Sequence, residues 1–149
     1  MTRFLKAAIA ACVLATMASC TIYTTNNGKL DGHWYLIKVD TLSTGGSVNY
    51  REQRVFWAFQ DKLLQMRSVL DDVDTYYFFR FQHTGNTLIV NQPHRYDRLN
   101  GDIEVTADSL KYLRQKGINY VDEYFDVEKL TSDEMVLSDD TLRLYFENY

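Results

Sequence analysis

LDGHWYLIKVD, residues Leu30–Asp40, is the stretch that decides the fold. Gly32, His33 and Trp34 follow a polar segment, and an extended apolar run begins directly after them. Aromatic and β-branched residues without helical spacing favour a strand. We therefore predict that the first strand begins here and that the rest of the chain closes around it.

Alternating apolar residues predict further strands along the rest of the chain. Polar pairs such as Asp61-Lys62 and Gly85-Asn86 separate them, and Gly85-Asn86 suits a tight hairpin turn with positive φ. The chain finishes as a meander of short strands. The predicted strands are Gln53–Gln60, Leu63–Leu70, Thr75–His83, Thr87–Asn91, Tyr124–Leu130, Met135–Leu137 and Leu142–Phe146.

One short helix is predicted over Thr106–Gly117. Thr106 is a suitable N-terminal cap, Leu110 and Leu113 share a face, and Gly117 is a suitable end. Pro93, the sole proline, is expected to end the strand before it. The segments Thr41–Glu52 and His94–Asp102 are expected to be loops.

Eight or nine short antiparallel strands linked by hairpins, with one helix, are typical of a barrel. We therefore predict a mainly β fold, an antiparallel up-and-down barrel of about eight strands with one short helix. A sandwich of two sheets is the structural alternative.

The N-terminus has the features of an export signal. Arg3 and Lys6 form a short basic region, residues 7–17 are apolar, and Met17-Ala18-Ser19-Cys20 closes the segment. This tetrapeptide resembles the bacterial lipobox, which implies that Cys20 is acylated. The expected organisation is a signal peptide over residues 1–19, a lipidated tether over 20–30 and one barrel domain over 31–149. An ordinary secretory signal with an incidental cysteine is the alternative.

The composition limits the partners of the mature chain. The formal charge of −4 becomes −6 once Arg3 and Lys6 are removed. An acidic chain without a basic cluster argues against binding to nucleic acid. Both cysteines, Cys12 and Cys20, precede the domain, so the barrel contains no disulfide and must be stabilised by burial alone. The membrane partner would be reached through the acyl anchor.

The residues Gly32-His33-Trp34, together with the ending FDVEKLTSDEMVLSDDTLRLYFENY, resemble the lipocalin-like (calycin-type) lipoproteins of the Bacteroidota. The resemblance covers residues 30–149. It implies a barrel whose end is closed by Trp34, with an arginine of the last strand packed over that ring. Arg143 is the candidate, although alternation with Leu142 and Leu144 would turn it away from the core.

The resemblance also bears on location. In Bacteroidota lipoproteins, acidic residues soon after the cysteine mark export to the cell surface, and the first acidic residue here is Asp31. The expected location is the bacterial cell envelope, with the protein facing the periplasm from the inner leaflet of the outer membrane.

A candidate ligand-binding wall lies on three neighbouring strands. Its members share the inward face in the predicted alternation: Trp57, Phe59, Met66, Tyr77, Phe79 and Phe81. Aromatic side chains and an adaptable methionine suit an apolar ligand, and the Tyr77 hydroxyl adds a polar contact. The alternative is that these bulky residues simply fill a small barrel.

Catalytic and metal-binding patterns are not found in the sequence. His33, His83 and His94 lack metal-ligand spacing, and the acidic run Asp71–Asp74 lacks the glycine and distal glutamate of a calcium loop, so a solvated turn is expected there. We therefore expect a non-enzymatic protein without metal or cofactor. The expected function is binding of a small apolar or amphipathic ligand in the barrel. The alternatives are a structural or interaction lipoprotein with a filled barrel, whose envelope partner the sequence does not identify, and a glycan-binding module.

Overall fold

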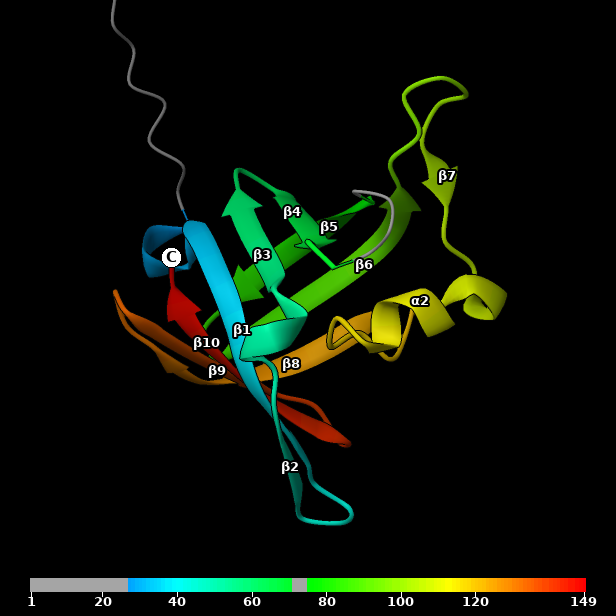
Figure 1. The fold of residues 1–149 in the computed structure, drawn as a ribbon. Helices are drawn as coiled ribbons and strands as arrows, with labels where there is room; N and C mark the ends of the chain where they lie inside the picture. Colours follow the sequence, from blue (N-terminus) through cyan, green and yellow to red (C-terminus); the bar gives the residue numbers. More distant parts are fainter. Residues whose placement is uncertain (1–26, 71–74) are drawn as a thin grey trace, which may run out of the picture.

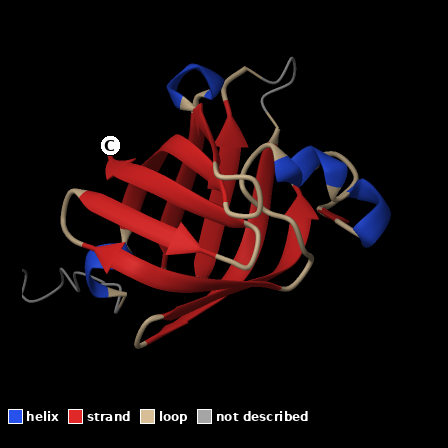
Figure 2. Cartoon of the chain, turned by 90° about the horizontal axis from the view of Figure 1, so that it is seen from below, coloured by secondary structure: helices blue, strands red, loops and turns tan. Residues whose placement is uncertain are grey.

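The computed structural model describes residues 27–70 and 75–149, and within them the chain forms a closed antiparallel barrel. Each barrel strand pairs with the next along the chain, which is the predicted up-and-down topology (Figures 1 and 2). The barrel strands are β1 (Gly32–Thr41), β3 (Val55–Gln60), β4 (Leu63–Ser68), β5 (Tyr76–Thr84), β6 (Thr87–Arg95), β8 (Glu123–Leu130), β9 (Glu134–Ser138) and β10 (Leu142–Asn148).

The barrel closes where β1 pairs with β10. The register runs from Trp34 opposite Asn148 to Thr41 opposite Leu142, with one irregularity between Leu36 and Lys38. Closure removes the unpaired edges that an open sheet would expose. The predicted barrel is therefore confirmed, and the two-sheet sandwich is not the architecture.

Every second side chain along the barrel strands points inward, and these side chains fill the interior of the barrel. In β3, Val55, Trp57 and Phe59 are buried, while the residues between them are partly exposed. Trp57 lies at the centre of an aromatic cluster, with its ring 5.0 Å from that of Phe146 and 5.9 Å from that of Phe125. Such mutual packing of large rings buries apolar surface, which stabilises a barrel without disulfides.

The two ends of the barrel are built differently. At one end lie the 3-10 turn η1 (Gly28–Leu30), the β3–β4 and β5–β6 turns, and the C-terminus, which Figure 1 shows beside η1. The Tyr149 N–H donates to the His33 carbonyl over 2.8 Å. We call this the η1 end. The opposite end, the α2 end, carries the connection from β7 to β8 with the helix α2 (Lys111–Arg114).

The first residues of the described chain belong to the fold. Leu30 of η1 is fully buried in the core, and the Asn27 side chain donates to Asp31 and to the Asp61 carbonyl, each over 2.7 Å. Residues 28–30, expected in the tether, therefore cap the barrel. The expected signal peptide, Cys20 and the rest of the tether up to residue 26 lie outside the described residues.

The structure has two additional strands, one within the first expected loop and one just after the second. β2 (Gly46–Asn49) pairs with the far part of β1, and η2 (Arg51–Gln53) follows it, within the segment expected to be a loop. β7 (Ile103–Glu104) pairs with the end of β6. Both strands are short hairpin extensions that lie outside the barrel wall (Figure 1).

Pro93 does not end β6, contrary to the prediction. The strand continues to Arg95 through a register irregularity, at which Gln92 has a φ of 51°. A bulge needs no N–H from the proline, and the Pro93 carbonyl still accepts from the Val105 N–H over 2.8 Å. β4 ends at Ser68, two residues before the predicted end of that strand at Leu70, and Leu70 is 56% exposed.

The predicted helix over Thr106–Gly117 is present in shortened form. It consists of the 3-10 turn η3 (Ala107–Ser109) followed by α2. The Ser109 hydroxyl accepts from the Thr106 N–H over 3.1 Å, so the helical segment starts at Thr106 as expected. Gly117, with a φ of 92°, lies just beyond its end, also as expected.

Candidate functional site

The α2 connection, residues 105–119, folds over and into the α2 end of the barrel. Leu113 and Ile118 are fully buried in the same core cluster as the barrel strands. The Trp57 indole N–H donates to the Lys116 carbonyl over 3.0 Å, so the connection is held at the centre of the barrel. The connection thereby acts as a plug that leaves a hollow on its outer side.

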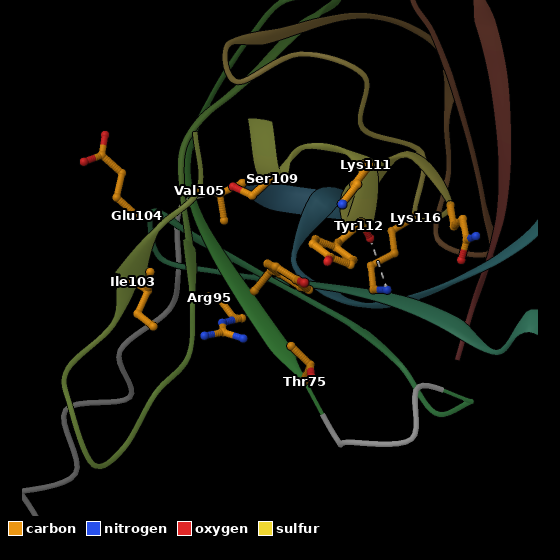
Figure 3. Close-up of a pocket in the computed structure, with 11 residues that line it drawn as sticks. Thr75, Arg95, Ile103, Glu104, Val105, Ser109, Lys111, Tyr112 and Lys116 are labelled. Atoms are coloured by element: carbon orange, nitrogen blue, oxygen red, sulfur yellow. Dashed lines mark hydrogen bonds between the residues drawn. The ribbon is translucent and has the colours of Figure 1, made fainter. Parts of the chain in front are cut away.

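That hollow is a pocket of about 530 Å³ between β5, β6, β7 and α2 (Figure 3). Its volume lies within the usual range for sites that bind small molecules. Apolar side chains and polar groups share the lining: Thr75, Tyr77, Arg95, Ile103, Glu104, Val105, Ser109, Lys111, Tyr112, Gln115 and Lys116. We call it the mouth pocket.

Among its described lining residues, the mouth pocket has more cations than anions. Arg95, Lys111 and Lys116 line it, and Glu104 is the one acidic residue among the lining residues that the structure describes. Figure 3 shows the Glu104 carboxylate directed away from both lysines. Among the described lining residues, cations therefore outnumber carboxylates three to one, in a chain whose net charge is negative.

Lys116 is unusual among these cations because its residue surface is only 3% exposed. Its Nζ lies 3.5 Å from the Tyr112 carbonyl and 5.6 Å from the centroid of the Tyr77 ring. Lys111 places its Nζ 5.0 Å from the centroid of the Tyr112 ring. The two tyrosine rings thus help to hold the ammonium groups at the pocket.

The predicted ligand-binding wall faces the barrel interior, as its alternation indicated. Trp57, Phe59, Met66, Phe79 and Phe81 are at most 4% exposed and belong to the core cluster. Of the six residues in the prediction, Tyr77 is the one that lines the mouth pocket. Met66 is opposite Trp57 on one side and Tyr77 on the other, which confirms β4 as the middle strand. Contact of the wall with a ligand stays a prediction.

The predicted pair of Trp34 and Arg143 is wrong. Arg143 is opposite Asp40 in the β1–β10 register, six residues along β1 from Trp34, or roughly 20 Å. It binds Glu128 of β8 instead, over 2.9 and 3.0 Å. Because Leu144 and Phe146 face inward, the side chain of Arg143 faces outward. Trp34 is fully buried, as expected for a residue that closes the barrel, and donates from Nε1 to the Leu30 carbonyl over 2.9 Å.

Glu123 secures the end of the α2 connection. Its residue surface is 1% exposed, and its Oε2 accepts from the N–H groups of Asn119 over 2.7 Å and Tyr120 over 3.0 Å. Burial raises the pKa of Glu123 to about 7, and the charge of Asp139 adds to this, while the two N–H donors oppose it. Asn119 in turn donates to Thr141 over 3.0 Å, which joins the connection to the β9–β10 turn.

The outer face of the barrel carries a separate group of aromatic residues. Tyr35 of β1 stacks on Phe56 of β3, with centroids 4.9 Å apart, and Tyr149 packs edge-on against Phe56 at 5.2 Å. Phe78 and Tyr96 form a second contact at 5.9 Å. Tyr149 is 79% exposed, so this group is in part accessible to solvent.

Metal ligands are not gathered in the described part of the chain: no three His, Cys, Asp or Glu residues there lie close enough to hold an ion. The run Asp71–Asp74, expected to be a solvated turn, lies outside the described residues. Across residues 27–70 and 75–149, no helix has the length and apolar character needed to cross a bilayer.

Sequence reasoning missed most of the mouth pocket. Ile103, Glu104 and Val105 belong to an unpredicted hairpin, and Arg95 belongs to a stretch expected to be loop. The available signal was the predicted helical segment itself, which contains Lys111 and Lys116.

Comparison with known proteins finds a matching family model and similar solved structures. A family model described as a lipocalin-like domain matches residues 15–149. The crystal structure of a lipocalin-like protein from Bacteroides uniformis is similar with a TM-score of 0.62 at 20% identity, covering 82% of this chain and 100% of that one. An uncharacterized protein from Bacteroides eggerthii is similar with a TM-score of 0.57 at 16% identity, covering 80% of this chain and 99% of that one. Among curated proteins, no match was found.

Proposed function

The chain belongs to the family of lipocalin-like domains, and from that premise we propose that it is a lipid-anchored envelope lipoprotein that binds a small amphipathic ligand in the mouth pocket. The observation that carries the proposal is the pocket itself, a hollow of about 530 Å³ that joins apolar and charged side chains. The function requires binding alone, without catalysis, metal or cofactor.

The position of the pocket supports binding at the mouth rather than in the centre of the barrel. The centre is occupied by Trp57 and its ring neighbours, which leaves the interior to side chains. An eight-stranded barrel has roughly enough room for its own side chains or for one small ligand. The outer side of the plug offers a concave surface, and Tyr77 reaches it from the inward-facing wall.

A neutral fluorescent probe tests this proposal. N-phenylnaphthylamine is uncharged and fluoresces more strongly in an apolar site, so titration into the mature chain, residues 20–149 without acyl groups, should show saturable binding. Tyr112→Ala should weaken it several-fold, because Tyr112 lines the pocket and is already 57% exposed, which limits any effect on folding. Tyr124→Ala, at a 62% exposed position of β8, is the matched control. Absence of saturable binding, or equal losses in both variants, would contradict the proposal.

The anchor is proposed from the lipobox-like sequence that ends at Cys20. Buried acyl chains contribute about 0.8 kcal/mol per CH₂, so two or three chains hold a protein to a membrane durably. Cys20→Ala should abolish acylation and release the protein from the membrane fraction. A variant that still sediments with membranes, or a wild type without an acyl mass increment, would exclude the anchor.

The same proposal places the protein on the periplasmic side of the outer membrane. Protease added to intact cells should therefore leave it undigested, while digestion after permeabilisation should remove it. Loss of the protein from intact cells would indicate the cell surface instead.

The outer aromatic group favours a second candidate function, an interaction module that contacts another envelope protein or a glycan. Tyr35, Phe56 and Tyr149 form one partly exposed cluster, and none of the three lines the mouth pocket. A photo-crosslinking residue in place of Tyr149 tests it in cells. Capture of one specific envelope component, together with no probe binding at the pocket, would favour this candidate over the first.

A further inference from the structure

We propose that Glu123 is a pH-dependent latch for the α2 connection: its side chain holds the connection most strongly at acidic pH, and rising pH loosens the connection. The connection supplies six of the residues that line the mouth pocket, which are Val105, Ser109, Lys111, Tyr112, Gln115 and Lys116. The latch would therefore regulate binding at that pocket. This inference rests on the proposed function and adds a regulation of the same site.

The latch lies where the α2 connection ends and β8 begins. Glu123 is the first residue of β8 and is 1% exposed. Its Oε2 accepts from the backbone N–H of Asn119 over 2.7 Å and from that of Tyr120 over 3.0 Å. One buried side chain thus holds the last residues of the connection against the barrel wall, so its release would free that end of the connection.

Asn119 brings a second carboxyl group to the same place. Its backbone N–H donates to Glu123, while its side-chain Nδ2 lies 3.4 Å from Asp139 Oδ2 and 3.0 Å from Thr141 Oγ1. Among the described residues, neither Glu123 nor Asp139 forms an ion pair with a basic side chain. Two neighbouring carboxyl groups without a cation between them favour protonation of the more buried one, which is Glu123.

The groups that face Glu123 come from three elements. Across the sheet it is opposite Val90 of β6, which is apolar and fully buried. The α2 connection presents backbone N–H groups, which favour the ionised form, and the Tyr120 side chain is 48% exposed. Asp139 presents a like charge from the β9–β10 turn. Burial first, and then Asp139, raise the pKa of Glu123 from 4.5 to about 7 against these donors.

This arrangement makes opening of the connection dependent on pH. In the closed state the pKa of Glu123 is about 7, whereas in an open state, with water at the carboxylate, it returns toward 4.5. The open state therefore releases the proton at lower pH than the closed state does. Opening becomes more favourable as pH rises from about 4.5 to about 7, and it changes little above that range.

Hydrogen exchange followed by mass spectrometry tests the latch, because the backbone amides of a segment exchange when that segment opens. In the mature chain, the protection of residues 110–120 should fall by about tenfold or more between pH 5 and pH 7.5, after correction for the intrinsic exchange rate. Residues 27–33 at the η1 end should keep their protection, because a local opening there leaves Glu123 buried.

Three variants identify the group responsible. Glu123→Gln keeps an oxygen acceptor but cannot ionise, so its connection should keep the same protection at both pH values. Asp139→Asn removes the neighbouring charge and keeps Oδ1 as the acceptor for the Thr141 N–H, so the fall should be smaller than in wild type. Asp140→Asn removes the same charge at an exposed neighbouring position and should behave like wild type.

A neutral ligand separates the latch from the proposed function. N-phenylnaphthylamine is uncharged throughout this pH range, so it adds no titration of its own. Bound at the mouth pocket, it should restore part of the protection of residues 110–120 at pH 7.5, because a ligand stabilises the state that binds it. If the probe does not bind but the pH dependence is present, the proposed function fails and the latch stands. Binding without any gain in protection would overturn the regulation of the pocket.

The latch itself is overturned by either of two results, whether or not the probe binds. The first is a fall in protection of the connection that is absent in wild type or equally large in Glu123→Gln. The second is a fall of the same size at the η1 end, since pH would then act on the whole fold.

Discussion

Trp34 shows at the residue scale how one side chain joins two elements. Its ring is fully buried, and its indole N–H donates to the carbonyl of Leu30, so this buried donor is paired. The residue therefore fixes η1 against the end of the barrel, in addition to filling space. Arginine over this ring, as expected from the family resemblance, is replaced in this role by the backbone of η1.

Replacement of Trp34 by alanine should cost about 3–5 kcal/mol of unfolding free energy, because a fully buried ring is removed and its cavity is incompletely refilled. Chemical denaturation followed by fluorescence of the remaining Trp57 would measure it. Tyr124→Ala, at an exposed position, should change stability by no more than about 0.5 kcal/mol. Equal small losses in both variants would remove Trp34 from the core.

Glu123 makes stability depend on pH. Its pKa is raised from 4.5 to about 7 in the folded state, chiefly by burial, so the folded state binds this proton more tightly than the unfolded chain does. The stabilising contribution is complete below about pH 4.5 and is lost as pH rises through about 7. Glu123→Gln keeps an oxygen acceptor for Asn119 and Tyr120 but cannot ionise.

We therefore expect the melting temperature of wild type to fall, relative to Glu123→Gln, as pH is raised from about 4.5 to about 7. Asp40 acts in a different window, since hydrogen bonds from Ser47 and Tyr145 hold its pKa near 2, and it is present in both proteins. The difference between the two melting curves thus isolates Glu123. A difference that does not vary with pH would show that folding does not raise the pKa of Glu123.

At the scale of elements, the α2 connection depends on one glycine. Gly117 has a φ of 92°, and a Cβ there would lie 2.9 Å from Leu144 Cδ1 and 3.5 Å from Trp57 Cζ2. Gly117→Ala therefore combines backbone strain with overpacking, each of which costs roughly 1–3 kcal/mol. Denaturation should show a loss of that order or larger.

Gly101→Ala provides a control for Gly117→Ala. It also has positive φ, at 85°, but nothing lies within 4 Å of an added Cβ. Its loss should be the smaller of the two, and the difference measures the steric contribution of the plug. If both variants lose the same amount, the connection is not packed into the barrel as described.

The strands could be predicted because apolar and more polar residues alternate along them. Val55, Trp57 and Phe59, for example, can all be buried on one face only if β3 is extended. The extensions β2 and β7 could not, because their residues are exposed and show no alternation. Pro93 misled the prediction because a proline is compatible with a strand only at a bulge, and the bulge has no sequence pattern of its own. The mouth pocket was missed for the same reason, since it is built from these irregular segments.

At the scale of the whole molecule, stability comes from burial without covalent cross-links. Cys12 and Cys20 are the two cysteines, and both precede the barrel. Reducing agent should therefore leave the melting temperature of the lipidated protein unchanged, because the Cys20 sulfur would be held in a thioether. A shift of several degrees on reduction would show a free Cys20 that forms disulfides.

The η1 end and the α2 end lie at opposite ends of the barrel, and this determines how an anchored protein would be oriented at a bilayer. The chain enters the fold at Asn27, at the η1 end, and Cys20 lies seven residues earlier, which limits its reach to roughly 25 Å. An anchored barrel would therefore rest with η1 and Tyr149 toward the lipid and hold the mouth pocket outward. The ligand would then enter the pocket from the aqueous compartment and leave to it, and would not come directly from the membrane.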